Sequence, residues 1–345
     1  MTHPIWTTAR PLGRVACVAA ALVACNSGAA PAAMPTVELG LPTDVTSFAN
    51  ADVAVAEAQG LFRAAGLTVR VRNLSSGVTV VQGVVGGTLN IGAASIEPVV
   101  NAEAHGAGLV IIGSYADRLT VSMVTPAAIQ TAAELRGKRL GIQQVGAFRE
   151  VMTRMVLEGA GLTPSDVSYV PVSANGYTSA LVQGTIQSAI VQEEQAIDVL
   201  QRDDKLHVLV DLGQLRPDYF YGTYVVTRSW LAHNEDIAKR FLTAIVRAHR
   251  FMYQDKAATV QIVARATGLS EQVISRAYDL LLVKHGAFAV NAGLDPTRIT
   301  RTIQTMQQFQ ILTGTAPSEP QLVDRGPISA VIRELGAWAG DPRWR

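Results

Sequence analysis

The chain has 345 residues, of which 48% are hydrophobic and 17% are charged, and its formal net charge is +1. This composition excludes an intrinsically disordered chain and argues against a strongly basic protein that binds nucleic acid. At roughly 100 to 200 residues per domain, the length predicts about two globular domains. The mean hydropathy of +0.22 would suit a membrane protein, but no apolar run after the N-terminus reaches the ~18 residues of a spanning helix. We therefore expect a soluble protein with an alanine-rich core.

The N-terminal segment has the pattern of an export signal. Two arginines and no acidic residue precede an apolar stretch at residues 15–24, as in bacterial signal peptides. Leu-Val-Ala-Cys at residues 22–25 follows the lipobox pattern, which predicts a signal peptide over residues 1–24 and a lipid on Cys25. A cut after Ala32, which ends a small-x-small pattern, is the alternative.

Export also determines what we expect of the cysteines and of the cellular location. The two cysteines are Cys17, inside the predicted signal peptide, and Cys25, so the mature fold is expected to contain no disulfide. Residues 25–35 are small and include prolines, which predicts a flexible tether. We expect a periplasmic or cell-surface protein that is held at the membrane by its lipid anchor.

From residue 36 the chain alternates short β-branched runs with amphipathic stretches. This alternation is typical of βαβ units around mostly parallel sheets. Strands are expected at residues 37–41, 67–72, 89–93 and 109–114, and helices at 51–65, 77–85 and 98–105. Together these elements predict one α/β lobe.

A second set of elements begins after Thr125-Pro126. Strands are expected at residues 139–143, 167–172 and 188–192, and helices at 147–159 and 177–184. A further strand is expected at residues 221–227, followed by helices at 235–253, 256–267, 270–282 and 296–312. We therefore predict a first lobe from residues 36–125 and 220–345, and a smaller second lobe from residues 126–219.

Several short motifs are similar to those of one protein family. Residues 55–69, which contain Gly-Leu-Phe and later Gly-Leu-Thr-Val, resemble the opening of the SsuA/THI5-like (NMT1) substrate-binding proteins of ABC importers. Three further segments resemble family motifs: residues 89–95, 135–142 and 221–224. The similarity extends over roughly residues 36–336. Gln187 departs from the family pattern, because many relatives have an aspartate there, and this weakens any assignment to the sulfonate or nitrate branches.

The resemblance implies a periplasmic-binding-protein type II fold, the Venus flytrap. In that fold two α/β lobes are joined by two crossover strands, with a helical C-terminal part. The implied function is to capture a small organic solute between the lobes and to deliver it to the permease of an ABC-type importer. Hinge movement is then expected near Ser122–Pro126 and Arg216–Thr223. We expect a monomer.

The residues themselves show no sign of catalysis. The chain contains no P-loop, nucleophile elbow or zinc-protease motif, and its six histidines lack the spacing of metal ligands. Glycine-rich residues 106–113 precede a predicted strand, whereas a dinucleotide fingerprint must follow one. We therefore expect no catalytic residue, no metal and no cofactor.

Small and hydroxyl residues lie in three turns where predicted strands lead into helices. Such turns present free backbone N–H groups at the positive end of a helix, and ligands of open α/β sheets bind at the carboxyl ends of strands. The expected ligand-binding residues in these turns are Ser75, Ser76, Ser95, Gln143, Gly146, Ala147 and Phe148. The alternative is that each serine only caps a helix.

Arg149 lies in the first turn of a predicted helix, where a cation is unfavourable with the helix dipole. It therefore either points to solvent or is compensated by an anionic solute or a nearby carboxylate. The remaining expected ligand contacts are Asp44, Phe48, Asn175, Gln192, Glu193, Tyr221 and Tyr224. For each aromatic residue the alternative is packing in the core.

The ligand is only loosely defined by these residues. Asp44 and Glu193 favour a ligand that donates hydrogen bonds, whereas Arg149 and the helix ends favour an anion. We favour an anionic or flat heterocyclic organic solute. Two other functions stay open: a ligand sensor that docks on a membrane receptor, and a THI5-like enzyme of pyrimidine synthesis. The enzyme branch resembles a Cys-rich intracellular protein, while this chain has no cysteine after Cys25.

Overall fold

The computed structural model describes Met1 and residues 34–43 and 47–340. The chain divides into two units, Met1–Ala33 and Met34–Arg345, and the elements described here belong to the second unit. The predicted signal peptide, Cys25 and Asp44 lie outside the described residues. Within the described part, no helix has both the length and the apolar character needed to cross a membrane.

The first sheet is mixed and has the strand order β2-β1-β3-β10-β4. β1 pairs in parallel with β2 and β3, while β10 runs antiparallel to β3 and β4. Its strands are β1 (Thr36–Leu41), β2 (Thr68–Asn73), β3 (Ile91–Ser95), β4 (Leu109–Ala116) and β10 (Gly222–Thr227). Every residue of β3 and β4 is buried, because helices cover both faces of such strands and favour continuous apolar runs.

The second sheet repeats this topology with the order β7-β6-β8-β5-β9. β6 pairs in parallel with β7 and β8, and β5 is the antiparallel strand between β8 and β9. Its strands are β5 (Val121–Pro126), β6 (Arg139–Ile142), β7 (Ser168–Pro171), β8 (Ser188–Gln192) and β9 (Leu206–Asp211). We call the two sheets with their helices the first and second lobes.

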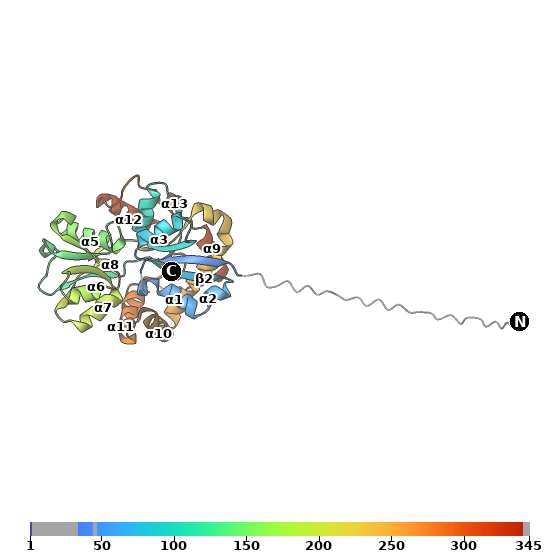
Figure 1. The fold of residues 1–345 in the computed structure, drawn as a ribbon, viewed down its shortest axis with the longest axis horizontal. Helices are drawn as coiled ribbons and strands as arrows, with labels where there is room; N and C mark the ends of the chain where they lie inside the picture. Colours follow the sequence, from blue (N-terminus) through green and yellow to red (C-terminus); the bar gives the residue numbers. More distant parts are fainter. Residues whose placement is uncertain (2–33, 44–46, 341–345) are drawn as a thin grey trace. The chain divides into compact units, whose positions relative to one another are not determined.

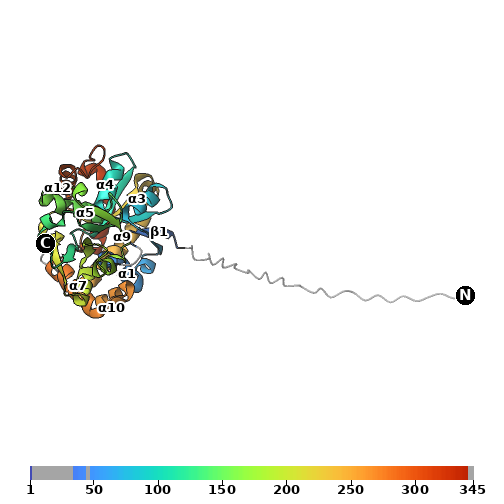
Figure 2. The same ribbon diagram turned by 60° about the vertical axis from the view of Figure 1, so that its left-hand side comes forward.

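Helices of the two lobes lie on opposite sides of the structure in Figure 1, where α5, α6 and α7 are green. First-lobe helices before the crossover are η1 (Phe48–Asn50), α1 (Ala51–Ala58), α2 (Leu61–Ala64), α3 (Gly77–Val85) and α4 (Ile96–Glu103). Second-lobe helices are η2 (Ala132–Leu135), α5 (Phe148–Gly159), η3 (Pro164–Asp166), α6 (Tyr177–Val182), α7 (Glu193–Arg202) and α8 (Leu212–Leu215). The turned view shows α4 and α5, one from each lobe, side by side (Figure 2).

The predicted helical C-terminal part is present. It consists of α9 (Arg228–Gln254), α10 (Lys256–Thr267), α11 (Glu271–Tyr278), a π-helical turn η4 (Asp279–Lys284), α12 (Pro296–Gln308), α13 (Glu319–Leu322) and α14 (Gly326–Leu335). α9 and α14 pack on the first lobe, whereas α11 packs against α7 of the second lobe. The C-terminal helices thus contact both lobes.

One boundary differs from the sequence prediction. Residues 121–125 were expected in the first lobe, but β5 pairs only with second-sheet strands. The chain therefore crosses to the second lobe at residues 117–120 and returns at residues 216–221. The prediction missed β5, which only the four residues 117–120 separate from β4. α7, β9 and α14 were missed as well.

The hydrophobic core is continuous between the two sheets. Leu39 of β1 belongs to the same buried cluster as Leu140 of β6, Met152 of α5 and Ile190 of β8. A smaller cluster lies wholly within the second lobe and includes Tyr177 of α6. The shared cluster brings the start of α5 and the start of α7 next to first-lobe residues, and this is where the candidate site lies.

Candidate functional site

Two of the predicted turns meet across the lobes. Gln143 Nε2 donates a hydrogen bond to the Ser75 carbonyl oxygen at 2.8 Å, and the Ser76 hydroxyl donates to Gln144 Oε1 at 3.2 Å. Ser76 Oγ also accepts a hydrogen bond from the Thr79 backbone N–H at 3.2 Å, so it caps α3 as the alternative reading held. The loop before α3 and the loop before α5 therefore form one polar contact between the lobes.

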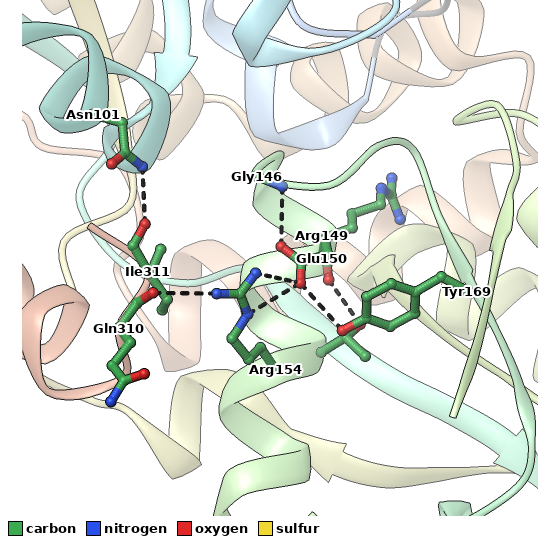
Figure 3. Close-up of polar contacts among 9 residues, drawn as sticks. Asn101, Gly146, Arg149, Glu150, Arg154, Tyr169, Gln310 and Ile311 are labelled. Carbon is green, nitrogen blue, oxygen red and sulfur yellow. Dashed lines mark hydrogen bonds and ion pairs between the residues drawn. The ribbon is translucent and has the colours of Figure 1, made fainter. Parts of the chain in front are cut away.

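The Gly146 turn is occupied by a carboxylate of the chain itself. Gly146 has a φ of +78°, which favours glycine, and its N–H donates to Glu150 Oε2 at 3.0 Å. Glu150 Oε1 accepts hydrogen bonds from Arg154 Nη2 at 2.8 Å and from the Tyr169 hydroxyl at 3.2 Å (Figure 3). Arg154 in turn donates to the Gln310 carbonyl oxygen of the first lobe at 3.4 Å. The Gly146 N–H that we expected to bind ligand is thus already paired.

Arg149 points into the protein and not to solvent. The residue is 2% exposed. Its guanidinium lies over the Tyr177 ring at 4.4 Å from the centroid, and it donates hydrogen bonds to the Ile190 carbonyl oxygen and, at 3.3 Å, to Gln195 Oε1. Of the alternatives stated for Arg149, its burial excludes exposure to solvent, and the Glu194 carboxyl lies close enough for the two charges to interact.

Beside Arg149 lies a cavity of about 320 Å³ that both lobes line. Thr43 and Ser47 come from the loop after β1, and Arg149, Asn175 and Glu194 come from the second lobe. The other lining residues are Ala174, Thr178, Ser179, Gln195, Asp198, Arg202, Thr267 and Leu269. The cavity unites two predicted residues, Arg149 and Asn175, with two that were missed, Ser47 and Glu194.

Ser47 and Glu194, two of the residues that line this cavity, each bury a polar side-chain atom. Glu194 is 2% exposed, and its Oε1 accepts a hydrogen bond from the Phe48 backbone N–H at 3.0 Å. Neither Glu194 Oε2 nor Ser47 Oγ has a hydrogen-bond partner among the described residues, although both atoms are buried. Burial raises the pKa of the Glu194 carboxyl, while its backbone hydrogen bonds and the Arg149 charge lower it in part.

Predicted aromatic residues of the two lobes meet near the crossovers. The Phe148 and Tyr221 rings have centroids 4.5 Å apart, and Tyr115 approaches Tyr221 edge to face at 5.5 Å. Gln192 Nε2 donates to the Tyr221 hydroxyl at 3.0 Å, and the Thr120 hydroxyl donates to Gln192 Oε1 at 3.0 Å. Burial raises the pKa of Tyr221 to about 12. Phe148, Gln192 and Tyr221 therefore contact one another, and Phe148 and Tyr221 belong to the buried hydrophobic cluster, as the core alternative describes.

Tyr224 and Phe48 lie in the first-lobe core instead. Tyr224 is fully buried, and its hydroxyl donates to Asp52 Oδ2 at 2.7 Å, which His249 Nε2 contacts at 3.1 Å. The Phe48 side chain is also fully buried, with its ring 6.2 Å from that of Phe288. The core alternative therefore describes both side chains, although the Phe48 backbone reaches Glu194.

The remaining predicted residues are placed as follows. Glu193 accepts a hydrogen bond from the Ser122 hydroxyl at 2.8 Å, and burial raises its pKa to about 7. Ser95 and Ala147 are buried at the N-cap positions of α4 and α5. Successive residues of a helix point about 100° apart, so the sequence could not tell which of Glu193 and Glu194 faces the cavity. Among the described residues, no group of three or more His, Cys, Asp or Glu could hold a metal ion.

Two sheets of the same strand order, joined by two short crossings and with polar strand-end turns that meet around a cavity, define the two-lobed binding-protein fold. Solved structures share this fold. The alkanesulfonate-binding protein SsuA from Xanthomonas axonopodis pv. citri, bound to MOPS, is 18% identical with a TM-score of 0.69, covering 84% of this chain and 98% of that chain. The periplasmic nitrate-binding protein NrtA from Synechocystis PCC 6803 is 14% identical with a TM-score of 0.73, covering 89% and 90%. The predicted periplasmic-binding-protein fold is confirmed.

The chain belongs to the NMT1/THI5-like family, whose model matches residues 47–258. A candidate binding protein of Brucella abortus is 23% identical over 215 residues, which are 61% of this chain and 66% of the relative. The 4-amino-5-hydroxymethyl-2-methylpyrimidine phosphate synthase of Aspergillus parasiticus is 24% identical over 226 residues, 61% of this chain and 65% of that protein. The chain thus spans less than two thirds of the length of both relatives. The family predicted from the sequence motifs is confirmed.

Proposed function

We propose that the protein is an extracytoplasmic solute-binding protein that captures a small organic molecule between its lobes and delivers it to an ABC-type importer. The observation that carries this proposal is the cavity at which Ser47 of one lobe and Glu194 of the other each bury a polar atom unpaired by any described residue. Buried polar atoms are nearly always hydrogen-bonded in folded proteins. A bound solute would supply the missing partners.

The proposed capture depends on hinge closure. The lobes are joined covalently by the short crossings at residues 117–120 and 216–221, which suit a hinge. Between the lobes, polar contacts include those of Gln143 with Ser75, Glu194 with Phe48, and Arg154 with Gln310. A solute that bonds to both lobes would add to these contacts and stabilise the closed form.

We propose binding without chemical conversion, despite the synthase among the relatives. The described residues that line the cavity include neither histidine nor cysteine. His249 is instead buried against Asp52 in the first-lobe core. The cavity therefore offers groups that orient a ligand but, among the described residues, no evident nucleophile with its base.

The location of the protein is part of the same proposal. A lipid on Cys25 would hold the binding protein beside a membrane permease, and Cys25 itself lies outside the described residues. Replacing it, Cys25→Ser, is expected to move the protein from the membrane fraction to the soluble fraction. A variant that stays in the membrane fraction would contradict the lipid anchor but not solute binding.

The function is tested with the purified protein, stripped of bound solute by mild denaturation and refolded. Its melting temperature is followed against sulfonates, aromatic acids, pyrimidines and amides. A ligand at 100 times its Kd adds ~2.7 kcal/mol to the free energy of unfolding, so one class should raise the melting temperature. No shift with any class would contradict solute capture.

Closure is tested with a pair of spin labels on cysteines at Val85 and Val182, which are exposed residues of α3 and α6. The background is Cys17→Ser and Cys25→Ser, which removes the chain's own cysteines. A bound solute should shift or narrow the distribution of distances between the labels at Val85 and Val182. A control pair at Val71 and Val85, both in the first lobe, should not respond.

A further inference from the structure

We infer that the cavity between Ser47, Arg149 and Glu194 selects an uncharged ligand that presents an N–H donor beside a carbonyl acceptor, as a small carboxamide does. This inference rests on the proposed function and specifies its ligand. The argument uses three features of the cavity: a buried acceptor, a balance of charge, and donors that are already occupied.

The buried acceptor is Glu194 Oε2. The other oxygen of this carboxylate is bonded to the Phe48 N–H at 3.0 Å, which fixes the orientation of the group. Oε2 is buried without a hydrogen-bond donor from the described chain, and Glu194 is one of the residues that line the cavity. A carboxylate oxygen only accepts hydrogen bonds, so the complementary ligand atom is an N–H or O–H donor.

The charges around the cavity are balanced. Asp198 and Arg202 form an ion pair at 2.9 Å on α7. Arg149 and Glu194 remain as one positive and one negative group, each 2% exposed. A ligand with a net charge would leave one of these two buried charges uncompensated, which is strongly unfavourable. An uncharged ligand keeps the balance.

The donors that would hold an oxyanion at the start of α5 are already engaged. The Gly146 N–H is bonded to Glu150 Oε2 at 3.0 Å (Figure 3). Arg149 donates to the Ile190 carbonyl and to Gln195 Oε1. A sulfonate, phosphate or carboxylate needs several donors, and around Arg149 only the N–H groups that these two bonds leave over could serve it. A single carbonyl oxygen needs one donor, which the guanidinium of Arg149 or the Ser47 hydroxyl can supply.

The cavity volume of about 320 Å³ is at the small end of ligand pockets. A ligand with one ring fits this volume. Ser47 Oγ, also buried and without a partner in the described chain, lies on the first-lobe side. A carboxamide between Ser47, Glu194 and Arg149 would bond to both lobes at once.

The test uses three probes of the same size and shape: benzamide, benzoate and benzamidinium. Their Kd values for the full-length purified protein are measured by isothermal titration calorimetry at pH 7.5. Benzamide should bind about tenfold more tightly than either ion, because only benzamide offers both a donor and an acceptor without net charge. Equal or tighter binding of benzoate or benzamidinium, or no binding of benzamide up to 10 mM, would overturn the inference.

The variant Glu194→Gln tests the assigned acceptor. Its amide still accepts the Phe48 N–H but places a donor in the position of Oε2, so the preference for benzamide over benzoate should fall about tenfold. Glu38→Gln is the matched control, since it makes the same change at a carboxylate that is paired with Arg72 at 2.8 Å and that does not line the cavity. That variant should keep the preference within about threefold. An unchanged preference in Glu194→Gln would overturn the assignment.

These outcomes separate the inference from the proposed function. If an anionic solute of the wider panel binds and changes the distance between the labels at Val85 and Val182, solute capture stands and the carboxamide assignment fails. If benzamide binds with the expected preference but the distance does not respond, the assignment stands and hinge closure fails.

Discussion

Two buried carboxylates of the second lobe differ in the number of hydrogen bonds that they receive from the rest of the protein. Glu150, fully buried on α5, receives hydrogen bonds from the Gly146 N–H, from Arg154 and from the Tyr169 hydroxyl. Glu194, 2% exposed at the start of α7, receives one from the Phe48 N–H, and the described residues supply no partner to its Oε2. Both lie close to the junction of the lobes.

The difference distinguishes a carboxylate that stabilises the fold from one that is available to a ligand. A buried carboxylate costs free energy unless its lone pairs are satisfied. Around Glu150 the protein itself supplies the hydrogen-bond donors. Glu150 also links the Gly146 turn to Arg154, which donates a hydrogen bond to the first lobe. Around Glu194 the described residues leave Oε2 without a donor, and this is the region with a cavity. A fully paired polar cluster stabilises the fold, whereas an incompletely paired one at a cavity indicates a ligand site.

The largest effect is expected for Glu150→Ala. Removing the carboxylate leaves the partly buried Arg154 guanidinium and the Gly146 N–H without their acceptor, so the free energy of unfolding should fall by ~3–5 kcal/mol. Urea unfolding followed by circular dichroism measures the change. Glu235→Ala is the control, because Glu235 forms a similar i,i+4 pair with Lys239 but is 58% exposed, and it should lose at most ~0.5 kcal/mol. Equal losses in the two variants would contradict the role of Glu150.

A second prediction concerns pH and the buried Glu97 of α4. Burial raises the pKa of Glu97 from 4.5 to about 7, while hydrogen bonds from Ser95 and Tyr219 lower it in part. The folded state therefore holds a proton that the unfolded state releases between these values, so stability should fall as the pH rises from about 5 to 7. The contribution of Glu97 is roughly 2–3 kcal/mol over this range.

Glu97→Gln should remove this part of the pH dependence. The expected result is a smaller loss of stability between pH 5 and pH 7 than in the wild type, measured by urea unfolding at each pH. Some dependence should remain, because burial also raises the pKa of Glu193 to about 7 and that of Asp117 to about 6. A pH profile identical to that of the wild type would contradict the assignment to Glu97.

The third prediction examines a paired cluster in the first lobe. Tyr224→Phe removes the hydroxyl that donates to Asp52 Oδ2 at 2.7 Å, and a hydrogen bond to a charged group contributes ~1.5–2 kcal/mol. Thermal unfolding should show a loss of this size. Tyr169→Phe is the comparison, since Glu150 keeps its other donors, and its loss should be smaller. A larger loss in Tyr169→Phe would reverse the expected order.

The smallest effect on stability is expected for Glu194→Gln in the absence of ligand. The amide oxygen still accepts the Phe48 N–H, and the change removes a buried charge whose second oxygen finds no donor in the described chain. The loss of the charge opposite the buried Arg149 is offset by relief of the burial of that carboxylate, so the free energy of unfolding should fall by at most ~1 kcal/mol. A loss above ~2 kcal/mol would show that the carboxylate serves the fold, as Glu150 does, and would remove the contrast between the two regions.

Local sequence signals predicted many of the elements correctly. The expected helices at residues 77–85 and 256–267 coincide with α3 and α10. Both have side-chain caps, Ser76 and Asp255, and such signals act within one turn of the helix. The first-sheet strand β1 was also found, because Val37, Leu39 and Leu41 place apolar side chains at alternate positions, and four of its six residues are buried.

Strand pairing could not be predicted in the same way. β5 is almost as completely buried as β4, and nothing in the residues between them indicates that the chain changes sheets. Which strands pair depends on contacts between segments far apart in the sequence, such as Val121 with Gln192. The lobe boundary therefore required the tertiary structure.

The site shows the same limit at the level of single atoms. The residues at the strand ends were predicted, but Gly146 and Gln143 proved to be paired within the protein, and Ser47 and Glu194 were missed beside the predicted Phe48 and Glu193. Neighbouring residues at one strand end fit the same sequence pattern, so the pattern cannot tell them apart. Only packing decides which of them faces a cavity and whether its polar atoms find partners.

By itself, the sequence determined the α/β alternation, the helix caps, the family and the position of the polar turns at strand ends. These properties depend on the local period of apolar residues and on short motifs. The tertiary structure alone decided that β5 joins the second sheet, that Glu150 is fully paired and that Glu194 faces a cavity. Those outcomes depend on which distant groups come within hydrogen-bond distance once the two lobes pack together, and no local pattern encodes that.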